Sequence, residues 1–296
     1  MSRYLGLPGF LTGGALRSLR VAVTLAAVTF AVAGCATSGG STEDVLTPVA
    51  PTPDKYAAIV VDAKSGKMLY SAKADELRYP ASLTKMMTLY LLFEAMDEGR
   101  VSRTDLIPIS ANASRRPPSK LGLKAGQSIP VDTAIRVLVV KSANDIATAV
   151  AEFLGGGSED RFADMMTAKA RAIGMSRTTF KNASGLPDPG QVTTATDMAR
   201  LSISLKRQFP HYYGYFGQTE VTVAGRTIKG HNKAMDMIPG ADGLKTGYTR
   251  ASGFNLATSV SRGGKSVVGV VMGEDTSAIR NARMVQLMST YVKKAE

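Results

Sequence analysis

Three short motifs place hydroxyls and amines at spacings that suit acyl transfer. In the first, Ser82 and Lys85 lie three residues apart at the predicted start of a helix, so both side chains project from one side of it. The helix dipole and burial among apolar neighbours would both lower the pKa of Lys85. A neutral lysine can take the proton of a serine hydroxyl, which makes Ser82 a candidate nucleophile. Taken alone, S-x-x-K is more often a helix cap beside a solvated lysine.

The other two motifs supply groups for substrate binding. Ser142 and Asn144 add a hydroxyl and an amide, in a stretch that alone would be a helix-capping loop. Lys245 and Thr246 lie on a predicted strand, where a cation and a hydroxyl suit a carboxylate, and Gly247 lets a ligand backbone approach closely. Each motif is weak by itself. In this order, S-x-x-K, S-x-N and K-T-G together form a specific set.

This set resembles the motifs of penicillin-binding proteins and serine β-lactamases. Four longer stretches are similar to the low-molecular-mass D-alanyl-D-alanine carboxypeptidases (peptidase family S11), namely residues 79–88, 141–145, 182–188 and 242–249. The similarity extends from about Lys55 to Lys294. It implies a penicillin-binding catalytic domain over residues 55–296, with the β-lactamase/transpeptidase-like fold and no cofactor or metal.

The resemblance implies that the protein cleaves D-alanyl-D-alanine peptides of peptidoglycan, with these roles for the first two motifs. Ser82 attacks the carbonyl between the two D-alanines, and Lys85 is the general base in acylation. Ser142 relays protons to the leaving amine and assists deacylation. Asn144 bonds the substrate amide.

The third motif, by the same resemblance, belongs to the substrate-binding strand. Lys245 and Thr246, followed by Gly247, hold the terminal carboxylate. The backbone N–H groups of Ser82 and Tyr248 form the oxyanion hole, although some relatives carry His at the position of Tyr248. The partners implied are peptidoglycan stem peptides and β-lactam antibiotics, the latter as covalent inhibitors.

The elements that must position these residues follow an α+β order. A hairpin is predicted over residues 56–62 and 68–71, and an apolar, buried helix over 83–97. Residues 98–131 look loop-like, and Asp132 is a candidate cap for a helix ending near Val140. Further helices are predicted at 146–153, 158–173, 197–206 and 278–293, and strands at 221–223, 227–228, 244–248, 254–260 and 266–272. We expect the N- and C-terminal strands to share one antiparallel sheet around a helical middle region.

The N-terminus has the order of a secretory signal. Arg17 and Arg20 precede an apolar run over residues 21–33 that is too short to span a bilayer. Residues 32–35 resemble a lipobox in which Cys35 is lipidated, although residues 31–33 also fit ordinary signal cleavage. We therefore predict a signal peptide over 1–34, a flexible tether over 35–54, and an exported, periplasmic protein anchored to a membrane through Cys35.

Composition excludes several classes of protein. One Cys in 296 residues excludes an internal disulfide and a Cys-rich zinc site. Only His211 and His231 could serve a Ser-His-Asp triad, and His231 could instead line a carboxylate pocket or lie at the surface. The net charge of +12 would suit nucleic acid, but export conflicts with that partner.

Three other activities fit parts of the pattern. A class A β-lactamase would need a Glu for its deacylating water, whereas the loop over residues 182–194 contains Asp188 and no Glu. A D,D-endopeptidase could use the same site with another leaving amine, and a sensor could bind wall peptides or β-lactams without turnover. Larger relatives add a C-terminal β domain and a membrane-binding helix. This sequence ends at Glu296, straight after the last predicted helix, so we expect Cys35 to supply the anchor.

Overall fold

The computed structural model describes residues 53–296. The predicted signal peptide, Cys35 and all but the last two residues of the predicted tether lie outside this range. Within it, no helix has the length and apolarity required to cross a membrane.

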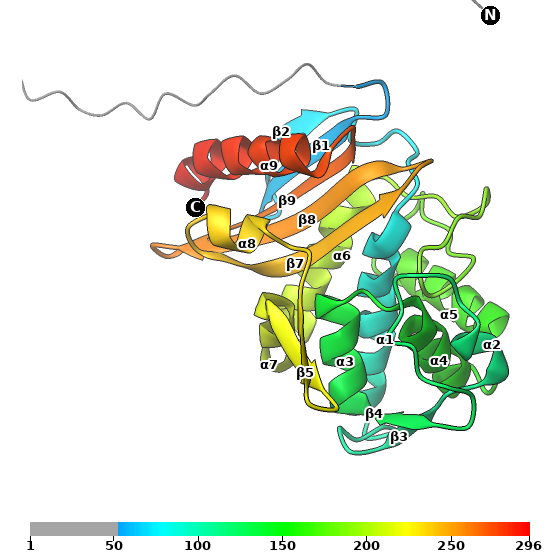
Figure 1. The fold of residues 1–296 in the computed structure, drawn as a ribbon. Helices are drawn as coiled ribbons and strands as arrows, with labels where there is room; N and C mark the ends of the chain where they lie inside the picture. The colour runs from blue at the N-terminus through cyan, green and yellow to red at the C-terminus, as the bar shows by residue number, and fades with distance from the viewer. Residues whose placement is uncertain (1–52) are drawn as a thin grey trace, which may run out of the picture. The chain divides into compact units, whose positions relative to one another are not determined.

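One antiparallel sheet joins the two ends of this part of the chain, in the strand order β2-β1-β9-β8-β7 (Figure 1). The N-terminal hairpin pairs with the C-terminal strands through β1 and β9, with Ile59 opposite Val270, as the sequence predicted. The strands span Ala57–Asp62 (β1), Met68–Ala72 (β2), Ala241–Thr249 (β7), Gly253–Arg262 (β8) and Lys265–Glu274 (β9). The edge strand β7 carries the K-T-G motif.

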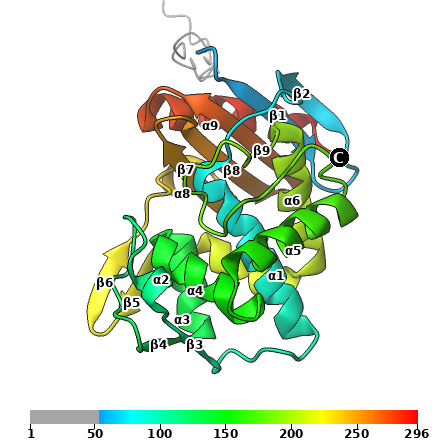
Figure 2. The ribbon, with the colours of Figure 1, turned by 90° about the vertical axis from the view of Figure 1, so that its right-hand side faces the viewer.

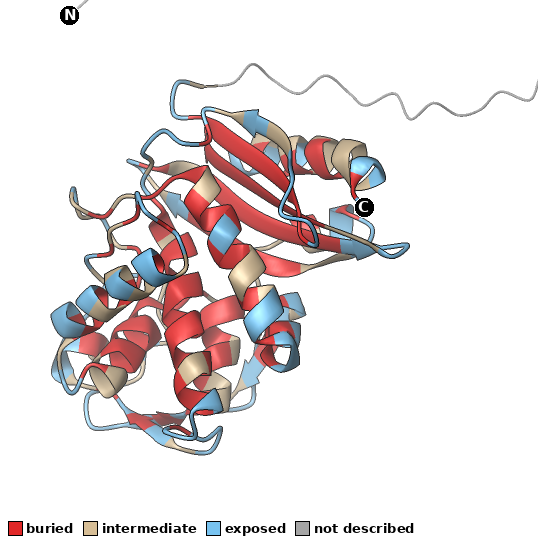
Figure 3. Cartoon of the chain, turned by 180° about the vertical axis from the view of Figure 1, so that it is seen from behind, coloured by how far each residue is buried: buried red, intermediate tan, exposed pale blue. Residues whose placement is uncertain are grey.

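Helices cover both faces of the sheet. Successive residues of a strand point to opposite faces, so Ala58 and Val60 pack with Met284 of α9 (Ser277–Tyr291), whereas Ile59 belongs to the main core on the other face. α6 (Ala195–Gln208) contacts β1 and β9. Figure 2 shows α6 and α9 on opposite sides of the strands. Because both faces are covered, β1 is buried throughout, as Figure 3 shows for the inner strands.

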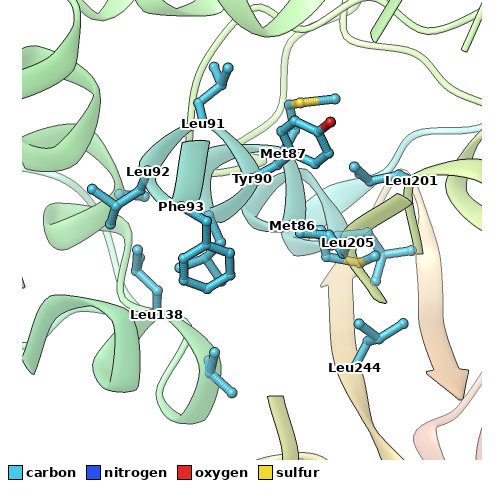
Figure 4. Packing of buried hydrophobic residues seen from close by; sticks show 14 of the residues in the cluster. Met86, Met87, Tyr90, Leu91, Leu92, Phe93, Leu138, Leu201, Leu205 and Leu244 are labelled. Carbon is cyan, nitrogen blue, oxygen red and sulfur yellow. The ribbon is translucent and has the colours of Figure 1, made fainter. Parts of the chain in front are cut away.

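The helical middle of the chain packs around α1 (Lys85–Asp97), which follows the short 3-10 helix η1 (Ala81–Thr84). All but two residues of α1 are buried, as its all-round apolar sequence predicted (Figure 4). Around it lie α3 (Val131–Val140), α4 (Asn144–Leu154) and α5 (Glu159–Ala172). The remaining elements are short: β3 (Leu106–Pro108), α2 (Ala111–Ser114), β4 (Ser128–Pro130), α7 (Pro210–Tyr213), η2 (Gly214–Gly217), β5 (Glu220–Val223), β6 (Arg226–Lys229), α8 (Ala234–Met237) and η3 (Val292–Lys294).

The structure corrects several predicted boundaries. Residues 98–131 are not a plain loop, because β3, α2 and β4 lie there and Leu106 pairs with Pro130. The strand predicted over residues 244–248 extends over all of β7, since β8 pairs with its full length. Asp132 does not cap α3. Its carboxylate, inside the first turn, instead accepts hydrogen bonds from Arg136 and Tyr215.

Candidate active site

Ser82 lies on η1, one turn before the amine of Lys85. The Lys85 Nζ is 3.2 Å from the Ser82 Oγ. Ala81, which precedes the serine, has a φ of 47°, a left-handed conformation that costs a non-glycine residue about 1–3 kcal/mol. This turn directs Ser82 into a cleft of about 710 Å³, while Lys85 lies fully buried beneath it.

The buried amine of Lys85 has acceptors on two further elements. It donates to Asn144 Oδ1 at 2.8 Å and to the backbone carbonyl of Ser184. Burial holds its pKa well below the ordinary value, and the charge of Lys245 lowers that pKa further. A neutral amine has two N–H groups and one lone pair. When both N–H groups serve the two carbonyl-type oxygens, the lone pair is left for the Ser82 hydroxyl.

The S-x-N motif forms the turn between α3 and α4. Ser142 has a φ of 61°, and within residues 53–296 its buried Oγ has no hydrogen-bond partner. Asn144 accepts from Lys85 and donates through Nδ2 to the Pro117 carbonyl at 3.0 Å. The motif therefore presents a free serine hydroxyl to the cleft, whereas the asparagine amide is already bonded within the protein.

Two glycines allow backbone to pack closely against Ser82 and the residue before it. A Cβ at Gly247 would lie 3.0 Å from the Ser82 backbone nitrogen, so any larger residue would have to push β7 away from this helix start. Gly185, with a φ of 84°, lies against the carbonyl of Ala81, which a Cβ there would meet at 1.9 Å. Asn255 of β8 donates to the carbonyls of Tyr79 and Pro80 and ties the preceding turn to the sheet.

β7 brings a second buried lysine to the cleft. Lys245 Nζ donates to the Thr246 carbonyl at 3.0 Å, and burial together with the charge of Arg280 lowers its pKa to about 7. Arg280, at the start of α9, is also buried, and desolvation lowers its pKa to about 10. No carboxylate lies among the described residues that line the cleft. Two cations held near one another without an anion suit a substrate carboxylate.

The cleft brings together the predicted residues of all three motifs. It is lined by Ser82, Ser142, Asn144, Thr246, Gly247 and Tyr248, with the Lys85 and Lys245 amines buried next to them. The Tyr248 side chain is 55% exposed and stacks on Phe254. His231 is exposed at the surface, at the rim of the cleft that it helps to line, and its place in a carboxylate pocket stays a prediction. Its pKa is lowered by burial and by Lys245 and Lys141.

Sequence reasoning missed three groups at this site. Arg280 comes from α9, far along the chain from the motifs, and no spacing rule links it to them. Ser184 acts through a carbonyl that any residue could supply, and Asn255 acts through its contacts with backbone. Asp188, the carboxylate of the loop over 182–194, accepts from Gly190 N and does not line the cleft.

Comparison with known proteins identifies the family. The family model of D-alanyl-D-alanine carboxypeptidase (peptidase S11) matches residues 44–276, which include all three motifs. The chain belongs to this family. The carboxypeptidase DacA of Escherichia coli is 35% identical over 249 residues, covering 82% of this chain and 62% of DacA. DacF of Bacillus subtilis is 32% identical over 237 residues, covering 78% and 60%. The chain thus spans about three-fifths of the length of these two S11 relatives.

Solved structures agree with this assignment and show the fold of penicillin-binding proteins. The carboxypeptidase DacD of Francisella tularensis superposes with a TM-score of 0.77 at 29% identity, covering 84% of this chain and 73% of that one. Penicillin-binding protein D2 of Listeria monocytogenes, in its ampicillin-bound form, superposes with a TM-score of 0.72 at 30% identity and is covered to 96%. The predicted β-lactamase/transpeptidase-like fold is therefore confirmed.

Proposed function

We propose that this S11 protein is a serine D-alanyl-D-alanine carboxypeptidase that removes the terminal D-alanine from peptidoglycan pentapeptides. The observation that carries the proposal is the Lys85 amine, fully buried, low in pKa and 3.2 Å from the Ser82 hydroxyl. A lysine that is neutral at working pH can act as the base that a serine nucleophile requires.

Acylation begins when Ser82 Oγ attacks the carbonyl between the two D-alanines and its proton passes to Lys85 Nζ. The backbone N–H groups of Ser82 and Tyr248 would stabilise the oxyanion, each donor contributing about 3–4 kcal/mol in such sites. The C–N bond then breaks, and the leaving amine takes up a proton relayed by Ser142. Water next attacks the acyl ester, which frees Ser82 and the shortened peptide.

The terminal carboxylate of the substrate would occupy the cationic end of the cleft. Thr246 and Arg280 line the cleft there, the buried Lys245 amine lies near Arg280, and Gly247 keeps the strand close to Ser82. The unpartnered hydroxyl of Ser142 faces the same space. Asn144 uses one Oδ1 lone pair for Lys85 and one Nδ2 hydrogen for the Pro117 carbonyl, so its second lone pair and second N–H group would be left for the substrate amide.

The test is incubation of the protein with a pentapeptide and, separately, with a cross-linked peptide dimer. Release of free D-alanine from the pentapeptide, lost in Ser82→Ala, is the expected result. Cleavage of the dimer alone would instead support a D,D-endopeptidase. No D-alanine release from either substrate, together with a covalent penicillin adduct on Ser82, would leave a sensor and overturn the proposal.

β-Lactams are proposed to act as covalent inhibitors of the same serine. Penicillin-binding protein D2 of Listeria monocytogenes, of which this chain covers 95–96%, has been solved in cefotaxime-bound and ampicillin-bound forms. Mass spectrometry of the protein after penicillin treatment should find the mass of the drug added at Ser82.

We also propose that the domain is exported and anchored in the periplasm as a lipoprotein through Cys35, with residues 36–54 as the tether. A lone cysteine after a short apolar run supports this placement. Fractionation of a Cys35→Ala variant tests it, since unchanged membrane association would contradict the anchor.

A further inference from the structure

A buried carboxylate connects the two loops that border the cleft. Glu159, the first residue of α5, is only 8% exposed. It accepts hydrogen bonds from the Arg116 guanidinium, from Thr148 Oγ1 at 3.2 Å and from the Ala183 backbone nitrogen at 3.1 Å. Arg116 and Ala183 lie on different loops, and Thr148 lies on α4.

Each of these bonds ends close to a group that orients the base. Ala183 precedes Ser184, whose carbonyl accepts from Lys85. Arg116 precedes Pro117, whose carbonyl accepts from Asn144, and Thr148 follows Asn144 by one helical turn. One carboxylate therefore fixes both loops and the helix that hold the partners of the Lys85 amine.

Stability alone does not account for such a group. Burying the Glu159 carboxylate beside the partly exposed Arg116 guanidinium costs desolvation energy, and well-packed apolar residues at such sites are often as stable or more so. A hydrogen-bonded ion pair adds geometric specificity, because each of its hydrogen bonds fixes the position of the loop or helix that donates it.

We propose that Glu159 is a positioning residue for acylation, which holds the loops of Arg116 and Ala183 so that Lys85 stays aimed at Ser82. This inference rests on the proposed function. Glu159 acts through Asn144 and Ser184, because within residues 53–296 its hydrogen bonds come from Arg116, Thr148 and Ala183 and none joins it to Lys85 or Ser82.

Its charge has a second, separable effect on the base. The charged groups that act on Lys85 are Lys245 from β7, Asp145 from α4 and Glu159 from α5. Burial and Lys245 lower the Lys85 pKa, whereas the two carboxylates raise it. Removing the Glu159 charge should therefore lower this pKa further and move the acid limb of the acylation profile to lower pH.

The experiment measures acylation by a chromogenic cephalosporin across pH in the wild type, Glu159→Gln and Glu94→Gln. Glu94 is the control. It forms an ion pair with Lys169 at 2.6 Å and lies on α1, roughly 13 Å along that helix from Lys85, and its side chain is 25% exposed against 8% for Glu159. We expect the acylation rate to fall about 10- to 100-fold in Glu159→Gln, with the acid limb moved to lower pH, and to stay within twofold in Glu94→Gln.

Two results would overturn the inference. One is an unchanged acylation rate and pH profile in Glu159→Gln. The other is a fall in acylation rate that is equal in Glu159→Gln and Glu94→Gln and that follows only the melting temperatures of the two variants. A purely structural role would give this second result. A wild type that no β-lactam acylates would instead contradict the proposed function.

Arg116→Gln provides a second variant should Glu159→Gln fold poorly. It removes one bond from Glu159 and keeps the carboxylate charge. The acylation rate should fall, by less than in Glu159→Gln, without a move of the acid limb to lower pH. A rate equal to that of the wild type would contradict the role of this ion pair in positioning.

Discussion

Two buried lysines lie at the same cleft, and their surroundings differ. Lys85 has three oxygen neighbours from three segments, those of Ser82, Asn144 and Ser184. Lys245 has a single acceptor within residues 53–296, the carbonyl of Thr246, and its strongest charged neighbour is another cation, Arg280. Burial lowers the pKa of both lysines. Of the two amines, only that of Lys85 has acceptors on other segments, and these orient it toward Ser82.

The difference separates two uses of a buried amine. An amine whose N–H groups are already bonded, and whose lone pair faces a hydroxyl, suits a base. An amine with unused donors beside a second cation is poorly stabilised until an anion arrives, which suits a carboxylate receptor. Four predictions test this comparison.

Lys85→Met should give the largest effect. Methionine fills similar space without a base, so acylation should slow on the order of 10³-fold, within the range that a general base contributes. Stopped-flow acylation by a chromogenic cephalosporin measures the rate. The melting temperature should change little, because the gain from removing a buried amine is offset by the Asn144 and Ser184 oxygens that lose their donor. A loss below tenfold would reject Lys85 as the base.

Lys245→Met should weaken binding of the substrate carboxylate more than it slows the acylation step. Losing a charge-assisted bond to the terminal carboxylate, worth about 1.5–3 kcal/mol, predicts a roughly 10- to 150-fold fall in kcat/KM for a pentapeptide. The control is the same peptide ending in an amide, on which the variant and the wild type should differ little. An equal loss on both peptides would show that Lys245 acts on the reacting atoms.

In the pH profile of the activity, Lys85 should govern the acid limb and Lys245 the alkaline limb. Activity should rise with pH as Lys85 loses its proton and becomes a base. Lys245, with a pKa of about 7, loses its charge as pH rises, so the KM for the pentapeptide should increase by up to about tenfold per pH unit above 7. Initial rates across the pH range give both limbs. A KM that is flat above pH 7 would contradict the role of Lys245.

Tyr248→His should have the smallest effect. The side chain is exposed and the proposed role is that of its backbone N–H, so kcat/KM should change less than about threefold. A matched assay on the pentapeptide measures it. A loss of tenfold or more would show that the ring contacts the substrate.

Local patterns were sufficient to predict much of the fold. The all-round apolar run after Ser82 predicted the buried helix α1, and the β-rich runs at both ends predicted strands of one sheet. Predictions failed where tertiary contacts overrode local signals. Asp132 resembles a cap, but Arg136 and Tyr215 compete for its carboxylate. The short elements between residues 98 and 131 carry too little periodicity to be read from the sequence.

The sequence by itself determined which candidate residues are local neighbours, because residues within one helical turn or along one strand are brought together by their spacing alone. It thereby placed Ser82 beside Lys85, and Thr246 beside Lys245. Only the tertiary structure decided what surrounds them. Arg280, the Ser184 carbonyl and Glu159 reach the site from separate segments, and the depth of burial that lowers both lysine pKa values comes from their packing. Such contacts join residues far apart in the chain, and no local periodicity encodes them.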